Sequence, residues 1–242
     1  MSEGRRPAFY ALAPGGWRDW WTLLHPPYTL WHLSYVAIGA ASVAEVDLYR
    51  LGMSLLGFFL GVGLAAHALD ELRGRPLGTA ISDRVLQGVA IVSLAGAAAV
   101  GAVGIVQVSG WLAAFIVVGA FLVVAYNLEL FGGAFHSDLW FAIAWGGFPA
   151  LTGAFAQEGR LQVEGVLIAV ACVAISAAQR VLSTPVRRLR RRVVAVEGTI
   201  TLRDGTTEPI GAEVIRTAPE AALKLLALAM PVLAVALVIS RR

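Results

Sequence analysis

The chain is poor in charge and has almost no cysteine. Only 14% of its 242 residues are Asp, Glu, Lys or Arg, whereas about a quarter of a soluble domain is charged. The single cysteine, Cys172, excludes a disulfide framework and a cysteine-based metal site. The N-terminus lacks the basic, apolar and small-residue pattern of a cleaved signal peptide, so we expect none. A net charge of only +3 does not indicate a nucleic-acid partner.

Apolar runs make up most of what is present. Hydrophobic residues account for 58% of the chain and the mean hydropathy is +0.73, which is typical of a multi-pass membrane protein. Seven runs are close to the roughly 20 residues that cross a hydrocarbon core. They cover residues 29–46, 51–70, 85–107, 110–130, 138–157, 163–182 and 220–240. We therefore predict an all-α membrane bundle of about seven transmembrane helices.

Arginines predict how the bundle is oriented. Three precede the first run, three lie between the second and third, and five follow the sixth: Arg5, Arg6, Arg18; Arg73, Arg75, Arg84; and Arg187, Arg188, Arg190, Arg191, Arg192. Short loops rich in Lys and Arg stay on the cytoplasmic side. We expect a plasma or inner membrane protein whose N-terminus and even-numbered loops are cytoplasmic.

Two segments outside the runs have their own patterns. GGWRDWWTLLHPPYTLW carries four tryptophans, which favour the headgroup layer, and predicts a short interfacial helix broken by Pro26 and Pro27. Residues 193–211 alternate β-branched residues around Asp204-Gly205, which predicts a β-hairpin. We divide the chain into an interfacial segment (1–28), a six-span core (29–182), a basic cytoplasmic loop with the hairpin (183–219), and a last helix with the C-terminus (220–242).

Polar residues collect at the predicted cytoplasmic side. His67, Asp70 and Glu71 are spaced i, i+3 and i+4, which places them on one helix face. Further candidates lie around the next cytoplasmic loop and after the sixth run: Arg73, Arg75, Tyr126, Glu129, His136, Asp138, Arg180 and Arg187. Carboxylates suit Mg²⁺, which binds substrate phosphates, and arginines grip phosphate oxygens in pairs. Imidazoles with carboxylates suit a transition metal instead.

The same residues also have structural interpretations. His67, Asp70 and Glu71 fit a helix end in the headgroup zone, and Asp138 fits an N-terminal helix cap. The arginine run after the sixth span fits a topology signal that touches anionic lipid.

With these residues placed, the chain resembles the UbiA superfamily of intramembrane prenyltransferases. The resemblance lies in HPPYTLWHLSYVAIGA, in LAAHALDELRGRPLGTAIS, in Tyr126, and in DLWFAIAWGGFPALTGAFAQEG, and it covers roughly residues 24–160. It implies an all-helical enzyme that binds a polyprenyl diphosphate through Mg²⁺ held by two acidic motifs. Asp70 and Glu71 match the first motif, Arg75 matches the Arg-Pro-Leu that follows it, and Tyr126 matches a family tyrosine. Residues 176–192, where the second motif belongs, contain no acid.

Three functional hypotheses follow. The first is an isoprenoid-diphosphate enzyme, a prenyltransferase, with catalytic Asp70, Glu71 and Tyr126, with Mg²⁺ held by the acids, and with Arg73, Arg75, Arg180 and Arg187 on the diphosphate. The second is a non-catalytic relative that binds a lipid, a pigment or a protein partner, the last through the basic loop. The third is a membrane metalloenzyme whose ligands are His67, Asp70, Glu71, Glu129, His136 and Asp138.

Overall fold

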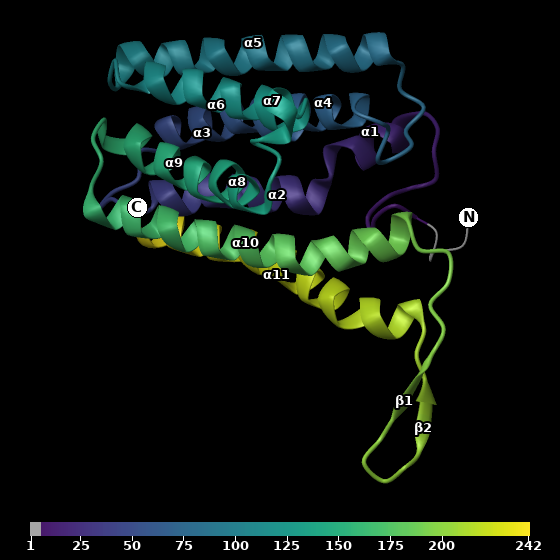
Figure 1. Cartoon of the computed structure of the whole chain (residues 1–242). Helices are drawn as coiled ribbons and strands as arrows, with labels where there is room; N and C mark the ends of the chain where they lie inside the picture. The colour runs from purple at the N-terminus through teal and green to yellow at the C-terminus, as the bar shows by residue number, and fades with distance from the viewer. Residues whose placement is uncertain (1–5) are drawn as a thin grey trace.

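The computed structural model describes residues 6–242, so Arg5 and the start of the interfacial segment lie outside the described residues. The described chain is mostly helical, with one two-stranded sheet (Figure 1). The first half contains α1 (Trp17–Leu24), α2 (Pro26–Ala40), α3 (Leu48–Phe58), η2 (Phe59–Ala66), α4 (His67–Leu72), α5 (Asp83–Gln107) and α6 (Leu112–Asn127). The second half contains α7 (Leu130–Gly133), α8 (Asp138–Ala142), η3 (Ile143–Gly147), α9 (Phe148–Glu158), α10 (Val163–Arg191), β1 (Thr199–Thr201), β2 (Thr207–Pro209) and α11 (Ala212–Ser240).

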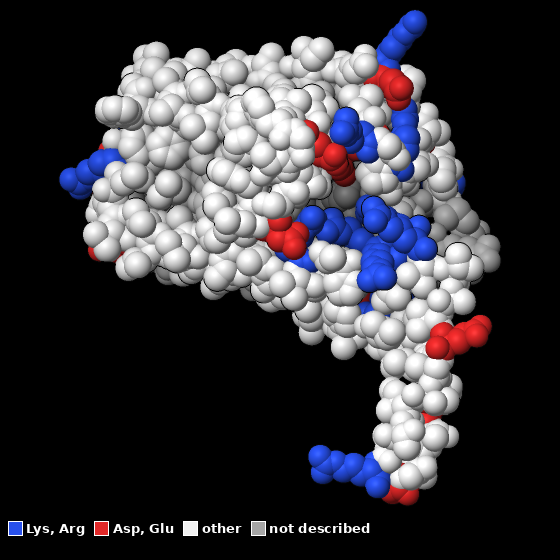
Figure 2. Space-filling model, in the orientation of Figure 1, with Lys and Arg blue, Asp and Glu red and all other residues white. Residues whose placement is uncertain are grey.

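Five helices among the described residues are long and apolar enough to cross a membrane. They are the continuous helix Leu48–Leu72, α5, the continuous helix Asp138–Glu158, α10 and α11. This fits a multi-pass membrane protein. In the space-filling view, the surface between the two charged ends of the bundle carries almost no Asp, Glu, Lys or Arg (Figure 2). Such an uncharged band suits contact with hydrocarbon.

The other two predicted spans form shorter helices. The run at 29–46 becomes α2, which begins at Pro26 and ends at Ala40, and the run at 110–130 becomes α6, which is 16 residues long. The first run ends early because residues 41–47 turn toward the next helix, where the Asp47 carboxylate accepts the backbone N–H groups of Tyr49 and Arg50. A polar N-cap of this kind starts a new helix.

Helix α2 lies at the centre of the bundle, packed against α9 on one side and α11 on the other (Figure 1). The α2–α9 contact is a close approach of two backbones. A Cβ at Gly153 would overlap the carbonyl oxygen of Val36, and one at Gly39 would overlap the backbone of Ala150. Small residues at such positions let helices in lipid pack closely.

Two of the membrane helices contain π-helical segments that shift the face of the residues that follow. Segment η2 leads directly into His67, and η3 contains Trp145. Both segments contact α2, while η2 also contacts α6 and η3 also contacts α10. Because π-helical turns are frequent at functional sites, the region between η2 and η3 is a candidate functional site.

The predicted hairpin is confirmed. Strands β1 and β2 pair antiparallel, with Thr201 opposite Thr207, and the hairpin extends away from the bundle (Figure 1). In its turn, the Asp204 carboxylate accepts hydrogen bonds from the hydroxyl and the N–H of Thr206, which lower the pKa of that carboxyl. Gly205 provides the positive φ of 85° that the turn needs. The short helix predicted before Pro26 is also present as α1, whose exposed side includes Trp17, Trp20 and Trp21.

Candidate functional site

The HALDELRGRPL stretch forms the end of a membrane helix and a tightly held loop. Glu71 is fully buried, and its carboxylate accepts three hydrogen bonds from that loop. Its Oε2 accepts the N–H of Leu77 at 3.0 Å, and its Oε1 accepts the N–H and hydroxyl of Thr79 at 2.8 and 2.9 Å. Both oxygens of Glu71 therefore hold the loop.

Arg75 serves the same loop from the other side. Its guanidinium donates to the carbonyl oxygens of Thr79 at 3.2 Å and Ile81 at 2.5 Å, and it is paired with the Asp83 carboxylate. Arg75 adopts a positive φ of 55°, which an arginine rarely adopts. The contacts of Arg75 with Thr79, Ile81 and Asp83 therefore all hold this loop in place.

Two further pairs connect separate elements. Arg73 contacts Glu129 at 3.2 Å, and both side chains are largely exposed. Arg180 contacts Asp138 at 2.5 Å, with its guanidinium also 5.2 Å from the ring centroid of Phe141. Arg180 is only 14% exposed, whereas Asp138 is 72% exposed. The Arg180–Asp138 ion pair therefore joins α10 to the start of α8, and the Arg180 side chain is largely buried.

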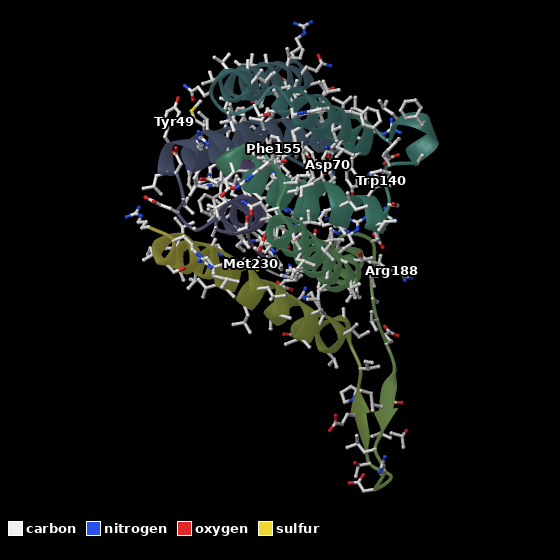
Figure 3. The ribbon with its side chains drawn as sticks, turned by 90° about the vertical axis from the view of Figure 1, so that its left-hand side faces the viewer. Tyr49, Asp70, Trp140, Phe155, Arg188 and Met230 are labelled. Atoms are coloured by element: carbon white, nitrogen blue, oxygen red, sulfur yellow. The ribbon has the colours of Figure 1, made fainter. Side chains whose placement is uncertain are left out.

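Asp70 differs from the other predicted acids. It lies within the bundle, as Figure 3 shows, whereas Arg188 lies at its outer edge. Among residues 6–242, the Asp70 carboxylate accepts no hydrogen bond and makes no ion pair, and the groups that act on it electrostatically include Arg191, His136 and Arg187. Asp70 is thus the one predicted carboxylate that the described part of the chain leaves available.

Two arginines of α10, Arg187 and Arg191, act electrostatically on this acid. Arg180, Arg187 and Arg191 are spaced by seven and four residues, which places them on one helix face. Arg180 and Arg187 also act on Tyr126, which is buried at the end of α6. We call this set the polar cluster: Asp70, Tyr126, His136, Arg180, Arg187 and Arg191. Figure 2 shows basic side chains gathered beside acidic ones at this end of the bundle.

The predicted histidines make backbone contacts through one nitrogen each. The Nδ1 of His67 lies 3.0 Å from the carbonyl oxygen of Gly63, and the Nδ1 of His136 lies 3.0 Å from that of Tyr126. The His136 ring stacks on Tyr126 with centroids 4.5 Å apart. Within the described part of the chain, no three His, Cys, Asp or Glu residues are placed to hold a metal ion.

Sequence reasoning gave no weight to His25, which the structure places beside the polar cluster. His25 joins α1 to α2 in a left-handed conformation, with φ of 47°. Its ring stacks on His67, with centroids 4.3 Å apart and planes 10° from parallel. The Nε2 of His25 is buried and has no hydrogen-bond partner among residues 6–242. The only sequence signal was its place before two prolines.

Tyr10 is the hydrogen-bond partner of His25. The Tyr10 hydroxyl oxygen lies 2.6 Å from His25 Nδ1, and burial raises the pKa of this phenol well above its ordinary value. Burial also lowers the pKa of His25 well below its ordinary value, and the neighbouring His67 and Arg191 lower it further. Both pKa shifts favour the neutral form of the side chain.

An apolar cavity extends to Trp145, which contacts Tyr126 of the polar cluster. It has a volume of about 160 Å³ and is bounded by the α3–η2 helix, α5, α6 and the η3–α9 helix. Its walls include Val62, Phe115, Phe148 and several glycines. Trp145 lines the cavity, and its ring meets that of Tyr126 edge-on with centroids 5.5 Å apart. The Tyr126–Trp145 ring contact thus links the apolar compartment to the residue on which the cationic Arg180 and Arg187 act.

Comparisons of the chain with protein-family models, curated proteins and solved structures found no match.

Proposed function

We propose that this membrane protein binds an isoprenoid diphosphate, with the diphosphate among Arg180, Arg187 and Arg191 and the isoprenoid tail in the apolar cavity. The observation that carries the proposal is the adjacency of these two compartments through Tyr126 and Trp145. A ligand that fits both must have a polyanionic head and an apolar tail. The resemblance to UbiA-like prenyltransferases supports the same ligand.

The arginines provide the recognition of the head. Guanidinium groups bind phosphate oxygens in pairs, and they do so more strongly where water is restricted. Arg187 has no carboxylate partner among residues 6–242, and the positive charges of Arg180 and Arg191 act on it. Such like charges repel one another, so an anion between them relieves the repulsion.

Prenyl transfer is the reaction that suits this arrangement. The allylic C–O bond breaks and its electron pair leaves on the diphosphate, where the arginines stabilise the added charge. An acceptor then bonds to the allylic carbon and releases a proton. The rings of Tyr126 and Trp145 lie where head and tail would meet, and an aromatic face stabilises a carbocation. Asp70 is the available base for the acceptor's proton.

The proposal includes an orientation and a span count. Helices α2 and α6, with 15 and 16 residues, cross the membrane together with the five longer helices, which gives seven spans. The polar cluster then faces the cytoplasm, together with the N-terminus and the hairpin, because the arginine-rich loops lie at that side.

A non-catalytic lipid-binding protein is the second candidate, and one observation favours it. Three of the four predicted acids have other partners: Glu71 holds its loop, Glu129 pairs with Arg73, and Asp138 pairs with Arg180. Asp70 alone could contribute to a Mg²⁺ ion that arrives with the diphosphate. Mg²⁺ commonly takes only one or two protein carboxylates together with phosphate oxygens.

The test uses purified full-length protein in lipid nanodiscs and radiolabelled prenyl diphosphates of several chain lengths, with and without Mg²⁺. Saturable binding, with transfer of the labelled prenyl group to an added aromatic acceptor and release of diphosphate, supports the prenyltransferase. Saturable binding without turnover supports the second candidate. Absence of binding at every chain length contradicts both.

A further inference from the structure

A second pocket, separate from the polar cluster, lies where the N-terminal segment, the end of α10 and the first half of α11 meet. Its volume is about 300 Å³. Among the described residues that line it, four are cations and one is an acid: Arg6, Arg190, Arg216, Lys224 and Glu220. The described lining is therefore predominantly basic. We call it the basic pocket.

Glu220 is shared among three of the cations. Its carboxylate lies 2.5 Å from Arg190, 3.2 Å from Arg216 and 3.9 Å from Lys224. Glu220 and Arg190 are both less than 10% exposed, so they form the floor of the pocket. Arg216 and Lys224 share this carboxylate with the closer Arg190, so among the described residues Glu220 compensates their two charges only in part. The pocket therefore favours a further anion.

The position of the pocket along α11 indicates where that anion comes from. Just beyond Lys224, α11 exposes an apolar stripe made of Leu225, Leu228, Val232 and Val235. From residue 225 to its end at Ser240 the helix has 16 residues, or about 24 Å at 1.5 Å per residue, which is most of a hydrocarbon core. Lys224 therefore lies at the level of the lipid headgroups.

The N-terminal segment closes the pocket. Arg190 donates to the carbonyl oxygen of Arg6 at 3.3 Å, and the neighbouring Arg191 donates to that of Pro7 at 3.2 Å. The Lys224 ammonium lies 5.4 Å from the ring centroid of Phe9. These contacts hold the segment across α10 and α11, so the cations converge on one volume instead of spreading over the surface.

From this geometry we infer that the basic pocket binds the phosphate headgroup of an anionic phospholipid, whose acyl chains lie along the exposed stripe of α11. Arg216 and Lys224 contact the phosphate from the helix that carries the stripe, and Arg6 contacts it from the segment above. Basic pockets between membrane helices at the headgroup level bind anionic lipids in this way. The inference does not rest on the proposed isoprenoid ligand, because none of its residues belongs to the polar cluster.

The experiment compares the thermal stability of the purified protein with phosphatidylglycerol, with phosphatidylcholine and with inorganic phosphate at matched phosphate concentration. We expect phosphatidylglycerol to raise the melting temperature and the other two to leave it unchanged. The double variant Arg216→Gln/Lys224→Gln should weaken the apparent affinity by about tenfold or more, since each charge-assisted hydrogen bond is worth that much. Arg203→Gln, at the exposed hairpin turn, is the control and should have no effect.

The Glu220→Gln variant distinguishes a lipid-binding site from a set of residues that only form ion pairs with one another. Removal of the negative charge should tighten the apparent affinity for phosphatidylglycerol, even if the variant melts at a lower temperature without lipid. Equal stabilisation by phosphatidylcholine, equal stabilisation by inorganic phosphate alone, or an unchanged affinity in the double variant would each overturn the inference.

Discussion

Glu71 and Thr79 are joined by two hydrogen bonds to one oxygen: the backbone N–H and the hydroxyl of Thr79 both donate to Glu71 Oε1, at 2.8 and 2.9 Å. With the Leu77 N–H on the other oxygen, this carboxylate has three donors in a fully buried setting. An acid that the sequence placed in a metal site therefore acts as the anchor of a loop.

The first prediction concerns this anchor. Glu71→Gln keeps the shape of the side chain but turns an amide NH₂ toward one of the donors, so we expect a loss of about 1–3 kcal/mol of stability. Thermal or denaturant unfolding in detergent measures the loss. Asp83→Asn, which removes the exposed partner of Arg75, should cost less than about 1 kcal/mol. A Glu71→Gln variant as stable as the wild type would contradict the anchor.

The second prediction concerns pH. The pKa of His25 is lowered in the folded protein, so the unfolded chain binds more protons as pH falls. The stabilising contribution is fully present above the unfolded pKa of about 6.5 and is lost as pH falls below it. We expect the melting temperature to decrease from about pH 7 toward pH 5.

His25→Asn tests the origin of that decrease. Asn accepts the left-handed conformation that this position requires and does not titrate. The variant should therefore have a flatter melting profile below pH 6.5. Tyr10→Phe removes the hydrogen-bond partner of His25 Nδ1 and should lower stability at pH 7 without flattening the profile. An unchanged slope in His25→Asn would mean that a group other than His25 causes the pH dependence.

The third prediction concerns the central helix contact. Gly153→Ala places a methyl group in overlap with the Val36 carbonyl oxygen, so the backbone of α2 or α9 must shift. Because the overlapping atoms belong to the backbone and not to a flexible side chain, we expect a loss of about 3 kcal/mol, at the upper end for overpacking. Gly52→Ala is the matched control in α3, where a Cβ meets nothing within 4 Å. That change should be neutral or stabilise by up to about 1 kcal/mol, as unfolding in detergent would show.

The fourth prediction concerns orientation. In a Cys172→Ala background, single cysteines at Thr206 and Arg160 place a thiol in the exposed hairpin turn and in the α9–α10 loop. A membrane-impermeant maleimide applied to intact cells should label the Arg160→Cys variant and not the Thr206→Cys variant. Inverted vesicles should give the reverse result. Labelling of Thr206→Cys in intact cells would contradict a cytoplasmic hairpin.

The elements that repeat a local pattern could be predicted from the sequence. The long apolar runs became α3–α4, α5, α8–α9, α10 and α11, and Asp204-Gly205 marked the hairpin turn. The separate roles of neighbouring charges could not be predicted. Asp70 and Glu71 are adjacent in sequence, but consecutive side chains on a helix point about 100° apart. One therefore meets its own loop and the other faces α10.

The rotation of about 100° per helical residue also explains why neighbouring arginines of α10 have different contacts. Arg187 and Arg191 face the polar cluster, Arg190 turns to Glu220 of α11, and Arg188 is exposed. The contact between His25 and His67 was hidden because it joins residues 42 positions apart (67 − 25 = 42). Their stacking depends on the left-handed backbone at His25 and on the η2 segment before His67, and neither has a clear local signal.

The most direct test of the proposed function is equilibrium binding of a labelled isoprenoid diphosphate to nanodiscs that contain the wild type, Arg187→Gln or Arg188→Gln. Arg187 lies in the polar cluster, whereas its neighbour Arg188 is exposed at the outer edge (Figure 3). We predict that Arg187→Gln weakens binding by about tenfold or more, the value of a charge-assisted hydrogen bond, and that Arg188→Gln leaves it unchanged. Equal affinities in all three proteins, or no binding to the wild type, would contradict the proposal.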